Sequence, residues 1–203
     1  MKIKICGITN LDDALKAEQL GADAIGFIFF GASKRYISPE IAREISRSLK
    51  PFTTKVGVFV NEDVKAVNKI AEYAGIDILQ LHGNEDPAYA AKLVRPFIKS
   101  IRVKDKSDLD IMSQFVNTTF LLDSFNANLF GGTGEKFDWG LIPQRKRNNI
   151  ILAGGVSRYN VGEIIEEIKP YAVDVSSSIE IEPGKKDHKK MEELFRVFRE
   201  AGG

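Results

Sequence analysis

The sequence has few of the residues that build disulfides and metal centres, and it has no long apolar run. One cysteine and two histidines occur among 203 residues. One cysteine forms no internal disulfide, and these side chains do not cluster as a zinc site requires. No stretch approaches the 18 apolar residues of a membrane span, and no apolar block follows Lys2 and Lys4 to form a signal peptide. We therefore expect a cytoplasmic protein without a metal ion.

An excess of charge of either sign is also lacking, since 29 Lys and Arg residues face 28 Asp and Glu residues. Domains that bind nucleic acid are usually strongly basic, and this one is not. Neither a GxxxxGK[ST] loop nor a GxGxxG fingerprint is present, so no sequence motif supports nucleotide binding. With 43% hydrophobic residues and no linker-like segment, we expect one globular domain over residues 1–203.

Apolar, β-branched runs alternate with helical patterns along the whole chain. Several runs are apolar at successive positions, as is typical of parallel strands covered on both faces. Eight strands and about eight helices in a chain of this length predict an α/β fold, a single closed (β/α)8 TIM barrel. An open doubly wound sheet is the alternative. The expected strands lie near residues 2–8, 24–29, 55–60, 78–82, 97–103, 119–124, 150–155 and 172–177.

Helices are expected where apolar residues recur every three or four positions, over 64–74, 161–168 and 191–198. Ser38 followed by Pro39 predicts a helix start, because serine caps the first turn and proline suits the first helical position. The same capping chemistry predicts N-caps at Asn10, Asn61 and Ser157.

Catalytic residues of such a barrel lie where the strands end. Cys6 ends the first predicted strand, before a glycine turn and a helix start, where a thiol can lose its proton more easily. Asp123 follows an apolar run, and apolar surroundings can raise the pKa of a carboxyl group until it donates protons near neutrality. The alternatives are a small buried core residue for Cys6 and a capping residue for Asp123.

Two further strand ends carry candidate binding residues. Arg35, in the loop after the second strand, has the planar set of donors that grips a carboxylate, although a loop cation is often only solvated. His82 ends the fourth strand and is either functional or a hydrogen-bonded structural residue. His188 lies among the charged residues 185–190, and we interpret it as solvated surface.

Three Gly- or Ser-rich stretches suit an anion, and two of them follow the seventh and eighth strands, where barrels often bind phosphate. Glycine lets the backbone approach a ligand and serine adds hydroxyl donors, although turns also use Gly-Gly pairs freely. The long loop over 124–136 is typical of a lid or a binding segment. The candidate phosphate residues are Gly132, Thr133, Gly134, Gly154, Gly155, Ser177 and Ser178.

Six short motifs follow one another along the chain: Lys4-Ile5-Cys6-Gly7-Ile8-Thr9, Ser33-Lys34-Arg35-Tyr36-Ile37-Ser38, Gln80-Leu81-His82-Gly83, Gly131-Gly132-Thr133-Gly134 with Phe137-Asp138-Trp139, Leu152-Ala153-Gly154-Gly155, and Asp174-Val175-Ser176-Ser177. This ordered set resembles the phosphoribosylanthranilate isomerase family of tryptophan biosynthesis. The resemblance runs from Lys2 to about Lys186. One departure is Ser178, where the family pattern has glycine; a left-handed backbone there would be strained by a side chain.

The resemblance implies an Amadori rearrangement of N-(5'-phosphoribosyl)anthranilate from an aminoaldose to an aminoketose. It assigns the general acid that opens the furanose ring to Asp123 and the general base that removes the C2 proton to Cys6. Arg35 would bind the anthranilate carboxylate, and the stretches after strands six, seven and eight would bind phosphate. His82 and Asp174 would have supporting roles. The resemblance implies no cofactor, a small-molecule substrate and a possible homodimer.

Two other functions remain open on the sequence. One is another sugar-phosphate isomerase, such as the aminoaldose isomerase of histidine biosynthesis, which uses aspartates on strands one and five. Here strand one offers Cys6, and the fifth strand, 97–103, has no acid. The other is a barrel that only binds a phosphorylated metabolite or a partner protein. The joint presence of Cys6, Asp123 and Arg35 argues against this second alternative.

Overall fold

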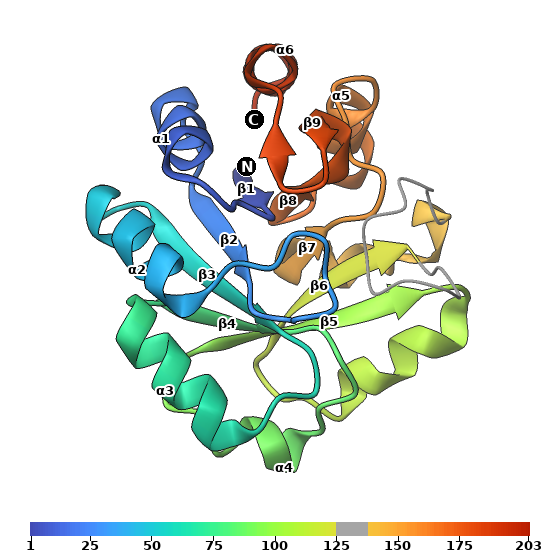
Figure 1. Ribbon diagram of the computed structural model, residues 1–203. Helices are drawn as coiled ribbons and strands as arrows, with labels where there is room; N and C mark the ends of the chain where they lie inside the picture. Colours follow the sequence, from blue (N-terminus) through green and yellow to red (C-terminus); the bar gives the residue numbers. More distant parts are fainter. Residues whose placement is uncertain (125–137) are drawn as a thin grey trace.

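The computed structural model describes residues 1–124 and 138–203, which form a closed barrel of eight parallel strands surrounded by helices (Figure 1). The first strand pairs with both the second and the eighth, so the barrel sheet has no open edge. The predicted barrel is confirmed, and the open sheet is excluded. The strands are β1 (Lys2–Cys6), β2 (Ala24–Ile28), β3 (Thr54–Phe59), β4 (Ile78–Leu81), β5 (Phe97–Val103), β6 (Thr119–Ser124), β7 (Ile150–Leu152) and β8 (Ala172–Val175).

The connections become less regular in the second half of the barrel. In the described residues, four α-helices reach ten residues or more: α1 (Leu11–Leu20), α2 (Pro39–Ser48), α3 (Val64–Ala74) and α6 (His188–Glu200). Eight full helices were thus too many for the described part of the chain. The other connections use α4 (Pro87–Ala90), α5 (Val161–Glu163), the π-helix η4 (Ile164–Ile168) and the 3₁₀ segments η1 (Lys106–Ser113), η2 (Trp139–Leu141), η3 (Gln144–Asn149) and η5 (Ser177–Ile179).

Two helix starts follow the predicted capping chemistry. The Ser38 hydroxyl accepts a hydrogen bond from the Ile41 backbone N–H, and proline follows Ser38 at the first helical position of α2. The Asn10 side chain accepts a hydrogen bond from the backbone N–H of Asp13 at the start of α1. Both side chains satisfy N–H groups that have no partner within the helix.

Two other N-cap predictions were wrong by two or three residues. The cap of α3 is Asp63 rather than Asn61, whose backbone is left-handed with φ 50° and whose side chain accepts a hydrogen bond from the Asn84 N–H. The residue before α5 is Asn160 rather than Ser157. Its side-chain oxygen accepts a hydrogen bond from the Ser157 N–H, so both loops use their polar residues to close turns before the helix begins.

Several strands are shorter than predicted at the ends that face the site. β1 ends at Cys6 because Gly7 turns the chain with φ +75°. β7 ends at Leu152, and the next turn contains Gly154 and Gly155 with φ of +73° and +74°. Glycine adopts this left-handed backbone without the strain of a side chain. At these turns the chain leaves the sheet, and the candidate site residues lie at the same ends of the strands.

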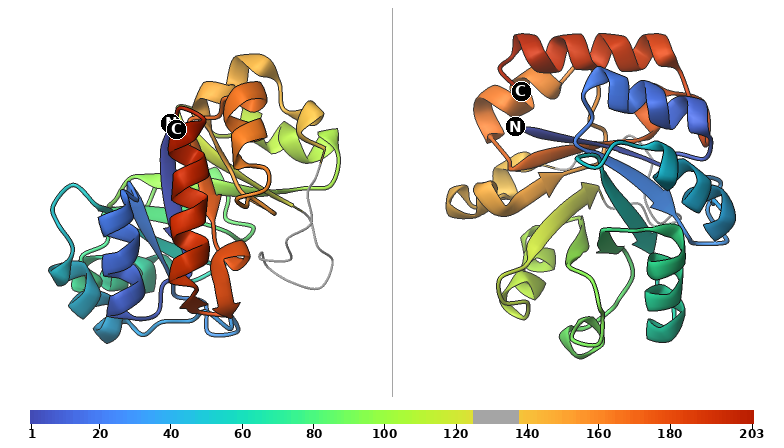
Figure 2. Two further views of the ribbon diagram at one scale, coloured as in Figure 1. Left: turned by 90° about the horizontal axis from the view of Figure 1, so that it is seen from above. Right: turned by 90° about the vertical axis from the view of Figure 1, so that its left-hand side faces the viewer.

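The end of the chain completes the outer layer. After η5 comes a short antiparallel hairpin of β9 (Glu180–Glu182) and β10 (Lys185–Lys186), and α6 then runs beside α1 (Figure 2). The buried apolar face of α6 is the periodic one that was predicted: Met191, Leu194, Phe195 and Phe198. None of the described helices has the length and apolar character needed to cross a membrane.

Candidate active site

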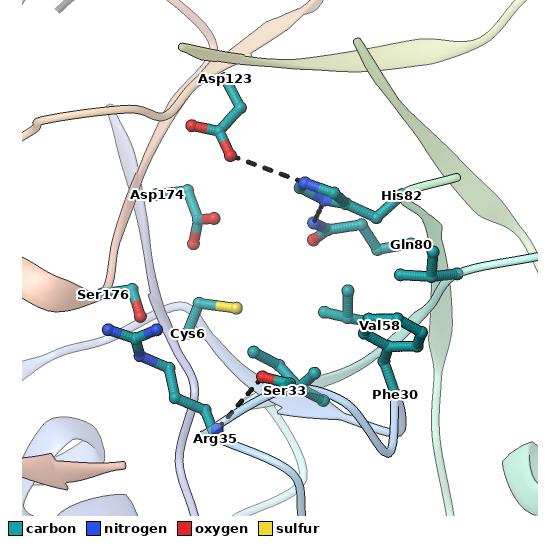
Figure 3. A pocket seen from close by; sticks show the side chains of 12 residues that line it. Cys6, Phe30, Ser33, Arg35, Val58, Gln80, His82, Asp123, Asp174 and Ser176 are labelled. Atoms are coloured by element: carbon teal, nitrogen blue, oxygen red, sulfur yellow. Dashed lines mark hydrogen bonds and ion pairs between the residues drawn. The ribbon is translucent and has the colours of Figure 1, made fainter. Parts of the chain in front are cut away.

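A pocket opens at the carboxyl ends of the barrel strands, and most of the predicted polar residues line it (Figure 3). The polar side chains come from the ends of β1, β4, β6 and β8 and from the loop after β2, while an apolar wall comes from β2, β3 and the residues that follow them. Closure of the sheet therefore brings together residues that are far apart in the sequence. The polar lining is Cys6, Ser33, Arg35, Gln80, His82, Asp123, Asp174 and Ser176; the apolar lining is Ile28, Phe30, Val58 and Val60.

Cys6 is the last residue of β1, and its side chain points into the pocket (Figure 3). Gly26 on β2 makes room for it, because a methyl group at Gly26 would lie 2.7 Å from the Cys6 sulfur. Burial raises the pKa of the Cys6 thiol, while the ammonium groups of Lys4 and Lys186 oppose this. The thiol is thus buried with cations close by, an arrangement in which a thiol can gain and lose a proton.

Lys4 and Asp174 form a buried ion pair next to the thiol. Lys4 lies two residues before Cys6 on β1 and is in register with Asp174 on β8. Its Nζ lies 2.7 Å from Asp174 Oδ1, and both side chains are less than one-tenth exposed. Burial lowers the pKa of the Lys4 ammonium, but the charges of Asp174 and Cys6 raise it by more, so the net pKa is raised. The ammonium therefore stays charged near the thiol.

Asp123 is a buried carboxyl group with one oxygen fixed and the other facing the pocket. Its Oδ1 accepts a hydrogen bond from the Ser124 backbone N–H at 2.9 Å. Its Oδ2 lies 3.6 Å from His82 Nε2, beyond ordinary hydrogen-bond distance. The Gln80 amide donates to His82 Nδ1 at 3.0 Å, so a neutral His82 ring carries its hydrogen on Nε2, toward Asp123. Oδ2 is thus left for a ligand.

Arg35 lines the pocket, but a carboxylate of the protein already holds part of its guanidinium. Its Nε donates to Glu180 Oε1 at 2.9 Å, and its Nη2 donates to Glu180 Oε2 at 2.7 Å. Hydrogen bonds to Glu180 raise the pKa of the Arg35 guanidinium. Nothing in the sequence pointed to Glu180, because it lies 145 positions after Arg35. The pair fixes the plane of the guanidinium beside Ser176 (Figure 3).

A second, smaller pocket is lined by several of the predicted phosphate residues. It contains Gly154, Gly155 and Ser177 and adjoins the first pocket through Asp123 and Asp174. A methyl group at Gly154 would lie 2.5 Å from the Ser124 nitrogen, so glycine is needed for this close approach. The prediction at Gly132, Thr133 and Gly134 lies outside the described residues.

The expected strain at Ser178 does not occur. Ser178 lies in the right-handed 3₁₀ segment η5, and the described non-glycine residues with positive φ are Asn61, Asn117 and Lys169. Its hydroxyl donates to the Val156 carbonyl oxygen at 2.6 Å. Ser178 thereby ties the turn after β8 to the turn after β7.

Two residues of the charged run 185–190 make contacts within the fold, and one of them is His188, which was interpreted as solvated surface. The Lys186 side chain is fully buried, and its Nζ donates to Glu180 Oε1 at 2.8 Å. His188 is partly exposed and lies 2.8 Å from Asp13 Oδ1. The contact of His188 joins residues that are 175 positions apart, which a local charge pattern does not reveal. Among the described residues, no group of three or more His, Cys, Asp or Glu side chains is arranged to hold a metal ion.

Comparisons with known proteins agree with the geometry. The family model described as N-(5'-phosphoribosyl)anthranilate (PRA) isomerase matches residues 3–197. The N-(5'-phosphoribosyl)anthranilate isomerase of Pelobacter propionicus is 46% identical over 98% of this chain and 96% of its own. The crystal structure of phosphoribosyl anthranilate isomerase from Thermotoga maritima is 40% identical, with a TM-score of 0.92, over 98% of this chain and 99% of that one.

A further solved structure contains a ligand. It is phosphoribosyl anthranilate isomerase in complex with reduced 1-(o-carboxyphenylamino)-1-deoxyribulose 5-phosphate. This chain is 40% identical to it over 98% of this chain and 99% of that one, with a TM-score of 0.88. The similarity thus extends over nearly all of both chains.

The close approach of β2 to Cys6 gives a testable prediction. Gly26→Ala adds a methyl group 2.7 Å from the Cys6 sulfur and 3.1 Å from its Cα, within a closed sheet. We expect the free energy of unfolding to fall by about 1–3 kcal/mol, the usual cost of overpacking. Urea denaturation followed by circular dichroism measures it.

Gly31→Ala is the matched control for this substitution. No atom lies within 4 Å of a methyl group added at Gly31. This variant should be as stable as the wild type or slightly more so. Equal stability of the Gly26 and Gly31 variants would mean that β2 does not restrict the position of Cys6.

Proposed function

Because the chain belongs to the N-(5'-phosphoribosyl)anthranilate isomerase family, we propose that Asp123 and Cys6 are the general acid and general base of its reaction. The chain is an isomerase of tryptophan biosynthesis, and its reaction is the Amadori rearrangement of N-(5'-phosphoribosyl)anthranilate to 1-(2-carboxyphenylamino)-1-deoxy-D-ribulose 5-phosphate. The observation that carries the assignment is that β1 and β6 present a buried thiol and a buried carboxyl group to one pocket.

The first step is the opening of the furanose ring. The protonated carboxyl of Asp123 gives its proton to the ring oxygen, and the bond between C1 and that oxygen breaks. The lone pair of the anthranilate nitrogen forms the C=N bond of the resulting Schiff base. Oδ2 is the oxygen available for this transfer, since Oδ1 accepts the Ser124 N–H.

The second step is proton removal from C2. The thiolate of Cys6 takes the proton, and the electron pair of the C–H bond forms a C1=C2 double bond, so the Schiff base becomes an enolamine. Tautomerisation moves a proton from the C2 hydroxyl to C1. C2 is oxidised to a ketone and C1 is reduced, so the reaction is an intramolecular oxidoreduction in which no external electron carrier takes part.

The remaining residues of the site bind or support the substrate in this proposal. Arg35 pairs with the anthranilate carboxylate through the part of its guanidinium that Glu180 leaves open. Backbone N–H groups and hydroxyls after β7 and β8 bind the phosphate, together with Gly132, Thr133 and Gly134 from the loop after β6. His82 directs an N–H toward Asp123, and Asp174 holds Lys4. The phosphate residues named from β7 and β8 are Gly154, Gly155, Ser177 and Ser178.

We also propose a homodimer, because the Thermotoga maritima isomerase is described as dimeric. Sedimentation equilibrium of the purified chain should give about twice the monomer mass of 22.6 kDa. A mass that stays at the monomer value over the micromolar range would reject the proposal. A cytoplasmic location stays a prediction from the sequence.

The acid and base roles predict two inactive but folded variants. Cys6→Ser and Asp123→Asn should each lower kcat by roughly 10²–10⁴-fold, the usual contribution of a positioned acid or base. Substrate fluorescence, which is lost on conversion, gives the rate. Titration with the reduced product analogue should show that both variants still bind. Asp110→Asn, at an exposed position, is the control and should keep the wild-type rate.

The pH dependence follows from the burial of Cys6. A base acts in its deprotonated form, and burial raises the pKa of the Cys6 thiol, so the reactive fraction increases as the pH rises toward that pKa. We expect kcat/KM to increase by about tenfold per pH unit on this acid limb. Near-wild-type rates in Cys6→Ser at any pH would show that Cys6 is not the general base.

The proposed binding role of Arg35 predicts a different kinetic change. Arg35→Met should raise KM for N-(5'-phosphoribosyl)anthranilate by about tenfold or more, since a charge-assisted hydrogen bond contributes about 1.5–3 kcal/mol. Lys34→Met removes an exposed neighbouring cation and is the control. An equal change in the two variants would indicate long-range attraction of the substrate rather than a specific contact.

A further inference from the structure

Lys186 is a buried charge that the steps above do not use. Its side chain has no exposed surface, and it lies on β10, after the last strand of the barrel. Its Nζ donates to the Cys6 carbonyl oxygen at 2.6 Å and to the Ser176 carbonyl oxygen at 3.2 Å. These carbonyls belong to the end of β1 and to the turn after β8. One ammonium group therefore joins two strand ends at the pocket.

The third acceptor of this ammonium connects it to Arg35. Lys186 Nζ donates to Glu180 Oε1 at 2.8 Å, and the same carboxylate accepts hydrogen bonds from Nε and Nη2 of Arg35. Hydrogen bonds from Arg35 and the charge of Lys186 hold the pKa of Glu180 below its usual range despite the opposing effect of burial. The carboxylate thus stays charged between two cations.

The hairpin that carries Lys186 is itself fixed to the start of the chain. The Lys186 backbone N–H donates to Asp13 Oδ2 at 2.8 Å, and the Thr9 hydroxyl donates to the Gly184 carbonyl oxygen. Asp13 also pairs with His188, at the first position of α6. The ammonium therefore approaches Cys6 from a rigid support rather than from a free loop.

The charges around the thiol show what this ammonium adds. Lys4 has Asp174 as its partner, whereas Lys186 and Arg35 share the single carboxylate of Glu180. Among these five described groups, three cations face two carboxylates, so one positive charge is in excess. A buried cation that is not fully paired stabilises a negative group beside it. In this pocket, that group is the Cys6 thiolate or a carboxylate of the substrate.

We propose that Lys186 is a positioning residue for the isomerisation, which fixes the strand end that carries Cys6 and, through Glu180, the guanidinium of Arg35. This inference rests on the proposed function, in which Cys6 is the base and Arg35 binds the carboxylate. It adds a residue that touches neither the substrate nor the reacting atoms. Lys186 sets the distance between the base and the carboxylate-binding group, because its ammonium holds the Cys6 carbonyl oxygen directly and Arg35 through Glu180.

The test removes the charge but keeps the shape, with Lys186→Met, and uses Lys185→Met as its control. Lys185 is the exposed neighbour on the same strand. Steady-state kinetics give kcat and KM, and alkylation of Cys6 by iodoacetamide in the absence of substrate gives the reactivity of the thiol as a function of pH. The charged or titratable groups that act on the thiol in this profile are Lys4, Asp174, Lys186 and Arg35.

We expect kcat of Lys186→Met to fall by about 10²-fold, as for a displaced catalytic group, and KM to rise. The alkylation profile should move to higher pH, because a cation that favours the thiolate is gone. Lys185→Met should match the wild type in all three measurements. A folded Lys186→Met protein with wild-type kcat and a wild-type alkylation profile would overturn the proposal.

A double variant covers the case in which Lys186→Met does not fold. Lys186→Met with Glu180→Gln removes both charges of the buried pair, and we expect the same loss of kcat, because the ammonium that ties the end of β1 to Arg35 is gone. A folded double variant with wild-type kcat also overturns the proposal. The alkylation measurement needs no turnover, so it separates this inference from the catalytic role of Cys6, which the Cys6→Ser variant tests.

Discussion

The site depends on the burial of charge at one end of a closed barrel. Closing the sheet removes its edges and turns the ends of β1, β6 and β8 toward a common pocket. Charged groups in such a place are costly unless each has a partner. Lys4 has Asp174, and Arg35 has Glu180, within 2.7 Å in both pairs. These pairs fix the side chains, so the pocket is organised before any ligand arrives.

The same burial gives the thiol and the carboxyl group different surroundings. Cys6 lies among the ammonium groups of Lys4 and Lys186, which oppose the effect of burial on the pKa of its thiol. Asp123 ends an apolar run and has a neutral backbone N–H and a histidine ring as its polar neighbours. An acid and a base that act in one reaction need such contrasting environments, because each must hold its proton at a different moment. In the proposed mechanism, this contrast arises because Cys6 lies on β1, next to the charged residues of β8, whereas Asp123 lies on β6.

The sequence was sufficient to predict the barrel and most of the pocket, because both depend on local signals. Successive apolar residues marked the strands, and strand ends marked the site. The failures have a common physical cause in contacts between distant residues. The burial of Lys186 was not predicted, because the Cys6 carbonyl oxygen that its ammonium contacts lies 180 positions earlier in the chain. The 3₁₀ segment after β5 was likewise not predicted, whereas the helix predicted over 161–168 is present as α5 followed by the π-helix η4.

At Ser178 the expectation of a strained backbone was wrong, because the backbone there is not left-handed. Glycine at that position would leave the backbone free to be left-handed, and a serine in such a backbone would be strained. In this chain, η5 is right-handed there, and the serine hydroxyl donates to the Val156 carbonyl oxygen. The side chain thus adds a hydrogen bond between two of the turns proposed to bind phosphate. A residue that departs from the family pattern therefore stiffens the region in which it lies, and the backbone N–H groups of these turns keep their direction without a glycine at 178.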